Sequence, residues 1–186
     1  MNTTIIILII LTIILVLMYN SLIAKKNQVE NLFASVDVQL KKRYDLVPNI
    51  VASVKKYMDH ESSLLEEITF LRSQGIKRNM NDSEKINIDK KFSKALAGLM
   101  VTVEEYPELK ASENVIELQK SLNEIEEQIS ASRRAYNQAV TDYNNAIEMI
   151  PTNFMAKMMN YKEKKLFEIE DTQKDNILVE ELFNNK

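Results

Sequence analysis

The chain contains no cysteine, only two glycines and only three prolines among its 186 residues. The lack of cysteine excludes disulfides, thiolate metal sites and cysteine nucleophiles. Glycine and proline are the residues most often found in tight turns, so their scarcity favours a few long helices over many short strands. The sequence therefore predicts an all-α fold.

Charged side chains are absent from residues 1–24, and residues 5–18 are apolar except for Thr12. Residues 3–22 reach the roughly 20 residues that a helix needs to cross a bilayer. The competing interpretation is a cleaved signal peptide, but the opening MNTT carries no lysine or arginine and no A-x-A-like cleavage site follows. The sequence predicts an uncleaved N-terminal anchor.

Two lysines fix the expected orientation of this anchor. Lys25 and Lys26 follow the apolar stretch, and nothing basic precedes it. The positive-inside rule then predicts a single-pass protein of the cell membrane, with a short outer N-terminus and a cytoplasmic body.

Turn-forming residues divide the rest of the chain into four predicted helices. Breaks are expected near residues 45–48, 75–83, 106–112 and 150–152, where all three prolines lie. The predicted helices cover about residues 22–45, 49–74, 83–105 and 113–149, with Asp82 or Ser83 as the N-cap of the third. A short helix from Phe154 to Met159, ended by Asn160, is expected beyond them.

The fourth predicted helix carries the clearest periodicity. Its apolar and small residues alternate spacings of 3 and 4 from Val115 to Ile150, which makes an a/d seam of about five heptads. Such a repeat is typical of left-handed, coiled-coil-like packing in antiparallel four-helix bundles. If the helices alternate in direction, the turn near Pro107 is the distal tip and the fourth helix returns to the membrane. The expected organisation is an anchor at residues 1–24, a bundle at 25–160 and a tail at 161–186.

Two sequence blocks carry a resemblance to a known family. They are SVDVQLKKRYDLVPNIVASVKKYMDHE at residues 35–61 and EEYPELKASENVIELQKSLNEIEEQISASRRAYNQAVTDYNNAIEMIPTNFMA at residues 104–156. Both resemble the LemA family of bacterial membrane proteins. The resemblance implies one membrane helix, a short outer N-terminus and a cytoplasmic four-helix bundle, but it implies no particular chemistry. Lys42 stands where the family usually has arginine, and Asn160 where it usually has glycine.

Polar residues interrupt the predicted apolar seams. Glu61 interrupts the second helix, while Tyr136 and Tyr143 interrupt the fourth. A buried charge needs a partner, so Arg43 or Arg133 is expected to pair with Glu61. The same residues are also consistent with a partner-binding cleft, or with exposure to solvent if the helix phase is misjudged. The candidate polar layer or partner site comprises Arg43, Asp45, Asn49, His60, Glu61, Arg133, Tyr136 and Tyr143.

A second candidate site follows Pro151. Methionine adapts to varied apolar surfaces, and lysine is attracted to anionic headgroups. The candidate membrane-surface segment comprises Phe154, Met155, Met158, Met159, Lys162, Lys164 and Lys165. The alternative is that these residues cap the membrane-near end of the bundle.

No catalytic, cofactor or metal site is predicted. His60 is the only histidine, whereas a structural zinc site needs about four histidine or cysteine ligands and a di-iron bundle needs two Glu-x-x-His motifs. No G-x-S-x-G motif is present, and Gly75 and Gly98 are too far apart to build a phosphate loop. No basic stripe with interleaved aromatic residues suggests nucleic-acid binding.

The sequence therefore predicts a membrane-tethered, non-enzymatic bundle that recruits or modulates unidentified protein partners, with self-association into a homo-oligomer as one route. Confinement to the membrane would raise the local concentration of whatever the bundle binds. The alternatives are an envelope-organising oligomeric coiled-coil protein and an enzyme that uses His60 and Glu61.

Overall fold

The computed structural model describes residues 2–77 and 80–167, and within these residues the chain forms helices and no strands. The predicted all-α class is confirmed. Residues 168–186, most of the predicted tail, lie outside the described residues. The elements are α1 (Asn2–Val54), the short 3₁₀ helix η1 (Asp59–Glu61), α2 (Ser62–Gly75), α3 (Asp82–Glu104), α4 (Pro107–Lys110), α5 (Glu113–Glu148) and α6 (Thr152–Met158).

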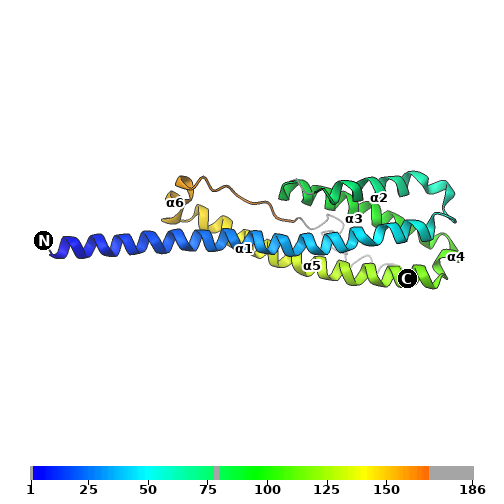
Figure 1. Cartoon of the computed structure of the whole chain (residues 1–186), viewed down its shortest axis with the longest axis horizontal. Coiled ribbons are helices and arrows are strands. Elements are labelled where there is room, and N and C mark those ends of the chain that lie inside the picture. Colours follow the sequence, from blue (N-terminus) through cyan, green and yellow to red (C-terminus); the bar gives the residue numbers. More distant parts are fainter. Residues whose placement is uncertain (1, 78–79, 168–186) are drawn as a thin grey trace, which may run out of the picture.

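Helices α1, α2, α3 and α5 form an antiparallel bundle (Figure 1). Helices α1 and α3 run toward the end of the bundle that carries α4, and α2 and α5 run in the opposite direction. Helix α5 lies along α1, and α2 packs on α3. The single turn α4, with Pro107 in its first turn, closes the distal tip where it was predicted. The core between the helices includes Phe33, Leu40, Ile68, Leu99 and Ile129.

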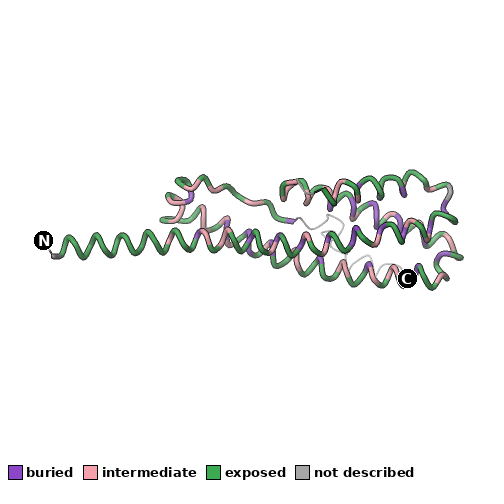
Figure 2. The backbone as a smooth tube through the Cα atoms, viewed as in Figure 1, coloured by how far each residue is buried: buried purple, intermediate pink, exposed green. Residues whose placement is uncertain are grey.

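The first part of α1 stands apart from the bundle. The helix has 53 residues, which at about 1.5 Å per residue make a rod of roughly 80 Å. Residues 3–17 are all exposed, and Leu22 is the first residue of α1 described as buried (Figure 2). Only 6% of the most apolar window of α1 is buried, unlike the core helix of a soluble protein. Within the described residues, α1 is the helix long and apolar enough to cross a membrane.

The predicted break near Pro48 was wrong, because α1 continues through this proline to Val54. Proline has no N–H, so it leaves the carbonyl oxygen of Tyr44, four residues earlier, without its helical partner. The Nε of Arg72 on α2 donates to that oxygen at 2.8 Å. A neighbouring helix thus supplies the missing donor, and α1 reaches the distal tip unbroken.

The start of α3 also differs from the prediction. Its N-cap is Asn81 rather than Asp82 or Ser83. The Asn81 Oδ1 accepts from the Glu84 N–H at 2.9 Å, and the Glu84 carboxylate accepts from the Asn81 N–H at 3.0 Å. This capping box satisfies two backbone donors that the first turn leaves open. Asp82 is left available for an ion pair.

The end of the bundle that carries α6 follows the sequence prediction closely. Helix α5 spans Glu113–Glu148, and the short helix α6 spans Thr152–Met158. Asn160 has the left-handed conformation, with φ of 53°, and turns the chain after α6. The following residues, 161–167, run back along α5 toward the middle of the bundle (Figure 1).

Candidate functional site

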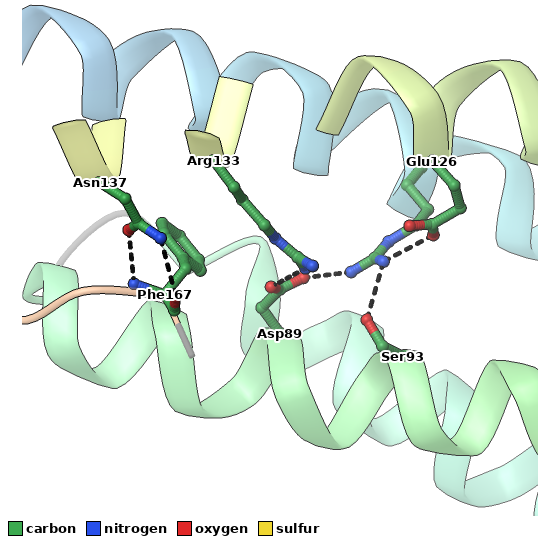
Figure 3. A network of polar contacts seen from close by, with 7 residues as sticks. Asp89, Ser93, Glu126, Arg133, Asn137 and Phe167 are labelled. Atoms are coloured by element: carbon green, nitrogen blue, oxygen red, sulfur yellow. Dashed lines mark hydrogen bonds and ion pairs between the residues drawn. The ribbon is translucent and has the colours of Figure 1, made fainter. Parts of the chain in front are cut away.

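A buried ion cluster joins three helices in the middle of the bundle (Figure 3). Asp89 on α3 lies between two arginines and accepts from both: Arg43 Nη2 of α1 binds its Oδ1, and Arg133 Nη2 of α5 binds its Oδ2. Arg43 Nη1 also donates to Glu126 at 2.7 Å and to the Ser93 hydroxyl at 3.0 Å. The cluster therefore ties α1, α3 and α5 together with charge-assisted hydrogen bonds.

Arg43 and Asp89 are withdrawn from water, with 0% and 1% of their surfaces exposed. Burial opposes the charge of Arg43, but Asp89 and Glu126 outweigh it and raise the pKa of the guanidinium above its ordinary value. The guanidinium also lies 4.8 Å from the centroid of the Phe92 ring. Arg43 is therefore a permanent cation whose stability depends on its acidic partners.

Buried Tyr44, next to Arg43 on α1, is held neutral. Burial, followed by the charge of Asp89, raises the pKa of Tyr44 to about 12. Its ring packs edge-on against Phe92 at 4.9 Å between centroids. Gly75 lies so close that a Cβ there would be 2.4 Å from Tyr44 Cζ. This glycine is required by the close approach of α2 to α1.

Asp89, the acidic residue that both arginines share, was not among the predicted site residues. It lies three positions before Phe92, so it continues the stripe of Phe92, Leu96 and Leu99 by one helical turn. An acidic residue on an apolar stripe is the signal that could have found it. Arg43 follows the same logic on α1, between the buried Leu40 and Val47.

The predicted pairing of Glu61 with Arg43 or Arg133 was wrong, because both arginines bind Asp89 instead. Glu61 is the half-buried N-cap of α2 and makes no side-chain cap hydrogen bond. His60 is exposed in the turn before it, and Asp45 and Asn49 are exposed on α1. The structure thus brings Arg43 and Arg133 together. It leaves Glu61, His60, Asp45 and Asn49 outside the cluster.

Tyr136 and Tyr143, the remaining members of that candidate set, hold residues 161–167 against α5. Tyr136 Oη donates to the Lys165 carbonyl at 3.0 Å, and Tyr143 Oη donates to the Lys162 carbonyl at 3.1 Å. Burial raises the pKa of both phenols, that of Tyr136 to about 12 with a further contribution from Asp82. The neutral, hydrogen-donating form of each tyrosine is the one that the fold favours.

An asparagine follows each of these tyrosines and binds the same segment through two hydrogen bonds. Asn137 accepts from the Phe167 N–H and donates to the Phe167 carbonyl, both at 2.9 Å. Asn144 does the same with the N–H and carbonyl of Lys164, both at 3.0 Å. We call Tyr136, Asn137, Tyr143 and Asn144 the Tyr–Asn rail. Each of these hydrogen bonds ends on a main-chain atom of the segment.

The spacing of the rail matches the spacing of the segment. The two tyrosines, like the two asparagines, are seven residues apart on α5, which corresponds to roughly 10.5 Å of helix. The main-chain groups that they bind are three residues apart on the segment, which corresponds to about 10 Å of extended chain. Side chains seven residues apart on α5 therefore match main-chain groups three residues apart on the segment. This match sets the register of the segment along α5.

Phe167 connects the rail to the ion cluster. Its ring packs against Tyr136, with 5.4 Å between centroids, and against Phe33 at 6.3 Å. The guanidinium of Arg133, which binds Asp89, lies 5.3 Å from the same ring. Phe167, Asp89 and Arg133 border a cleft of about 440 Å³ between α3, α5 and the segment. The two polar systems therefore meet at Arg133.

The candidate membrane-surface residues divide into four groups. Phe154 and Met158 are exposed on α6, whereas Met155 and Met159 are half-buried. Lys162 is exposed near the start of the segment. Lys164 and Lys165 follow the rail away from α6, and Lys164 Nζ lies 3.1 Å from Asp82 of α3. The last two lysines therefore lie at the side of the bundle rather than at the end that carries α6.

The ion cluster has the chemistry expected of a contact that holds helices together. Within residues 2–77 and 80–167, no three histidine, cysteine, aspartate or glutamate side chains come together as a group that could hold a metal ion. The strongest acceptor, Asp89, is engaged on both oxygens by arginines. The Nε atoms of Arg43 and Arg133 are buried without a hydrogen-bond partner.

Comparison with known proteins identifies relatives of the whole fold. The LemA family profile matches residues 32–180. Protein LemA of Metamycoplasma hominis is 24% identical over 165 residues, which cover 89% of this chain and 75% of the relative. Magnetosome protein MamQ 2 of Paramagnetospirillum magneticum is 22% identical over 194 aligned positions, covering 91% and 71%. None of these names indicates an enzyme class.

The family match covers most of the chain, including α2, α3, α5, α6 and most of the bundle portion of α1. It also includes every residue of the ion cluster and of the Tyr–Asn rail. The chain therefore belongs to the LemA family.

Proposed function

We propose that this protein is a single-pass membrane protein whose bundle stands on the cytoplasmic side and acts as a non-enzymatic scaffold for partner proteins. The observation that carries the proposal is the continuity of α1. Its first part is apolar and uncovered, and the same helix then enters the bundle core at Leu22 and Val29 without a break. A membrane crossed by the first part would hold the bundle at a fixed height above the bilayer.

The charges beside the apolar stretch support the cytoplasmic orientation. Lys25 and Lys26 lie directly after it on the bundle side, and residues 1–24 contain no lysine or arginine. Lysines next to a span favour retention of that side in the cytoplasm. Lys26 also forms an ion pair with Glu30 at 3.1 Å, one turn further along α1.

The interior of the bundle supports a scaffold role over catalysis. The buried charges neutralise one another across α1, α3 and α5, and His60 is exposed and remote in sequence from them. A rigid body fixed at a membrane raises the effective concentration of each partner that it binds. Recruitment of proteins to the bilayer, as proposed, requires no chemical step.

The absence of cysteine makes the orientation directly testable, because a single introduced cysteine is the only thiol. Ala111→Cys places it at the exposed distal tip, and Thr3→Cys places it at the start of the span. We expect a membrane-impermeant maleimide to label Thr3→Cys in intact protoplasts, and Ala111→Cys only after permeabilisation. Labelling of Ala111→Cys in intact protoplasts would place the bundle outside and refute the proposal.

The scaffold role needs a separate test in cells. A photo-crosslinking amino acid replaces the exposed apolar residues Phe70, Val101 or Ile116, one at a time, on α2, α3 and α5. We expect light-dependent adducts with other proteins from at least one position, and His60→Ala should leave those adducts unchanged. If all three positions gave no adduct, or adducts only with lipid, recruitment of proteins would be excluded for these faces.

A further inference from the structure

The corner between α5 and α6 exposes four large apolar side chains. The exposed fractions are 64% for Met149, 78% for Ile150, 65% for Phe154 and 84% for Met158. Ala156, on the other side of α6, is 2% exposed and faces the bundle. Helix α6 is therefore buried on one face and apolar on the face that nothing in the described residues covers. A cluster of this kind marks an interaction surface.

The position of α6 along α1 identifies the surface that would cover this cluster. Helix α6 packs against α1 and is the part of the bundle nearest the bare N-terminal stretch (Figure 1). Residues 3–22 make about 30 Å of helix, which equals the thickness of the hydrocarbon core of a bilayer. Leu22, the first residue described as buried, therefore marks the level at which α1 leaves the hydrocarbon. Helix α6 lies at that level.

Closing the end of the bundle is a role for only some of the side chains of α6. The half-buried Met155 and Met159 and the buried Ala156 close the end of the core. That closure leaves more than half of the surface of each of the four exposed residues open. The described residues supply no apolar neighbour for these side chains, and the bilayer crossed by α1 is the one that the geometry supplies.

The charges at this end are mixed, so they do not define the contact. Lys157 and Lys162 are exposed there, but so are Glu148 and Glu163. An attraction to anionic headgroups from the lysines is opposed by the two glutamates. The apolar side chains, rather than the net charge, would set the affinity for the surface.

We propose that α6 and the corner before it form a second membrane contact, in which Met149, Ile150, Phe154 and Met158 enter the boundary between headgroups and acyl chains of the bilayer that α1 spans. The inference rests on the proposed membrane anchoring. A span alone leaves the bundle free to rotate about α1 and to tilt. A second contact on one side of α1 fixes both, so that the same face of the bundle always points away from the membrane.

Depth measurements on the full chain test the contact separately from the anchor. Single cysteines at Leu11, Met158 and Ala111 carry an environment-sensitive fluorophore in nanodiscs of phosphatidylethanolamine and phosphatidylglycerol, with bromine at shallow or deep positions of the acyl chains. We expect deep bromines to quench the label at Leu11, shallow bromines to quench the label at Met158, and neither to quench the label at Ala111.

The outcomes distinguish the two proposals. Quenching at Leu11 without quenching at Met158 would overturn the second contact and leave the anchor intact. A label at Leu11 that no bromine quenches would overturn the anchor, and the second contact with it.

A matched pair of variants checks that the apolar side chains cause the contact. With the label on Lys157→Cys, we expect Phe154→Ser with Met158→Ser to reduce shallow quenching at least twofold. The control, Val101→Ser with Ile116→Ser, removes two exposed apolar side chains from α3 and α5 and should leave it unchanged. Both pairs are exposed, so the fold should tolerate either. Equal quenching in the two pairs would show that the apolar face of α6 does not hold it at the bilayer.

Discussion

The paired helices α1 and α5 are covered by different elements in their two halves. In the distal half, α2 and α3 cover the pair, and the core is apolar around one buried ion cluster. In the other half, α6 and residues 161–167 take their place, and neutral side chains bind main-chain groups. A buried charge depends on every partner being present, whereas the bonds of the rail are spread over two repeats. The distal half should therefore be the more sensitive to single substitutions.

The largest effect is expected at Asp89. Asp89→Leu leaves the fully buried Arg43 without its closest acidic partner, and breaking such a pair costs about 3–5 kcal/mol of unfolding free energy. Chemical denaturation of the full chain in detergent, followed by circular dichroism, would measure the loss. Glu126→Gln is the control, since Glu126 is 39% exposed and its exposed charge contributes less. Equal losses for the two variants would show that burial does not set the importance of the pair.

The glycines test the packing of α2 on α1. A Cβ added in Gly75→Ala meets the ring of the buried Tyr44 at 2.4 Å, and overpacking of this kind costs about 1–3 kcal/mol. Gly98→Ala meets nothing within 4 Å and removes a flexible residue from the middle of α3, so a gain of roughly 0.5–1 kcal/mol is expected. Thermal unfolding of both variants measures the difference. A stabilising Gly75→Ala would contradict the close approach of the two helices.

The rail predicts a smaller and more local effect. Asn137→Ala or Asn144→Ala removes two hydrogen bonds to residues 161–167, each bond being worth about 1 kcal/mol. We expect faster amide hydrogen exchange across residues 161–167, with little change in the unfolding of the four long helices. Asn145→Ala, at the exposed neighbouring position, is the control and should exchange like the original chain. Global unfolding in Asn137→Ala would mean that the two halves are not separable.

Alkaline pH acts on both halves at once. The pKa of Tyr44, in the distal half, and that of Tyr136, in the rail, are raised from 10.0 to about 12. A raised pKa means that the folded state favours the neutral phenol, so this stabilisation is complete below pH 10 and is lost as the pH rises toward about 12. We expect the unfolding free energy to fall between pH 10 and 12, less steeply in Tyr136→Phe. Ultraviolet titration showing both phenols ionised by pH 10.5 in the folded chain would disagree.

The long helices could be predicted from the sequence because their signals are periodic. The seam from Val115 to Ile150 gave α5 nearly to the residue, and the scarcity of turn residues gave the fold class. Pro48 misled the prediction for a physical reason. A proline normally ends a helix because a carbonyl loses its donor, but Arg72 supplies that donor from α2. A contact between residues 28 positions apart is not visible in a local pattern.

The candidate sites could be predicted only in part for the same reason. Arg43 and Arg133 were each named as a partner for Glu61, but both bind Asp89, which lies one turn before Phe92 on α3. The two tyrosines stood out because they interrupt an apolar seam. Their asparagine neighbours did not, because Asn137 and Asn144 bind the main chain of a segment that has no periodicity of its own.

One unbroken helix, α1, runs from the proposed membrane span to the distal tip of the bundle. Spin labels on Leu11→Cys and Asp45→Cys, both exposed, report on it directly in nanodiscs, with one label on each side of the junction at Leu22. An unbroken helix places these positions roughly 50 Å apart along its axis. Pulsed electron–electron double resonance should give one narrow distance distribution near that value. A broad distribution, or one centred well below it, would reveal a hinge between anchor and bundle and contradict the account.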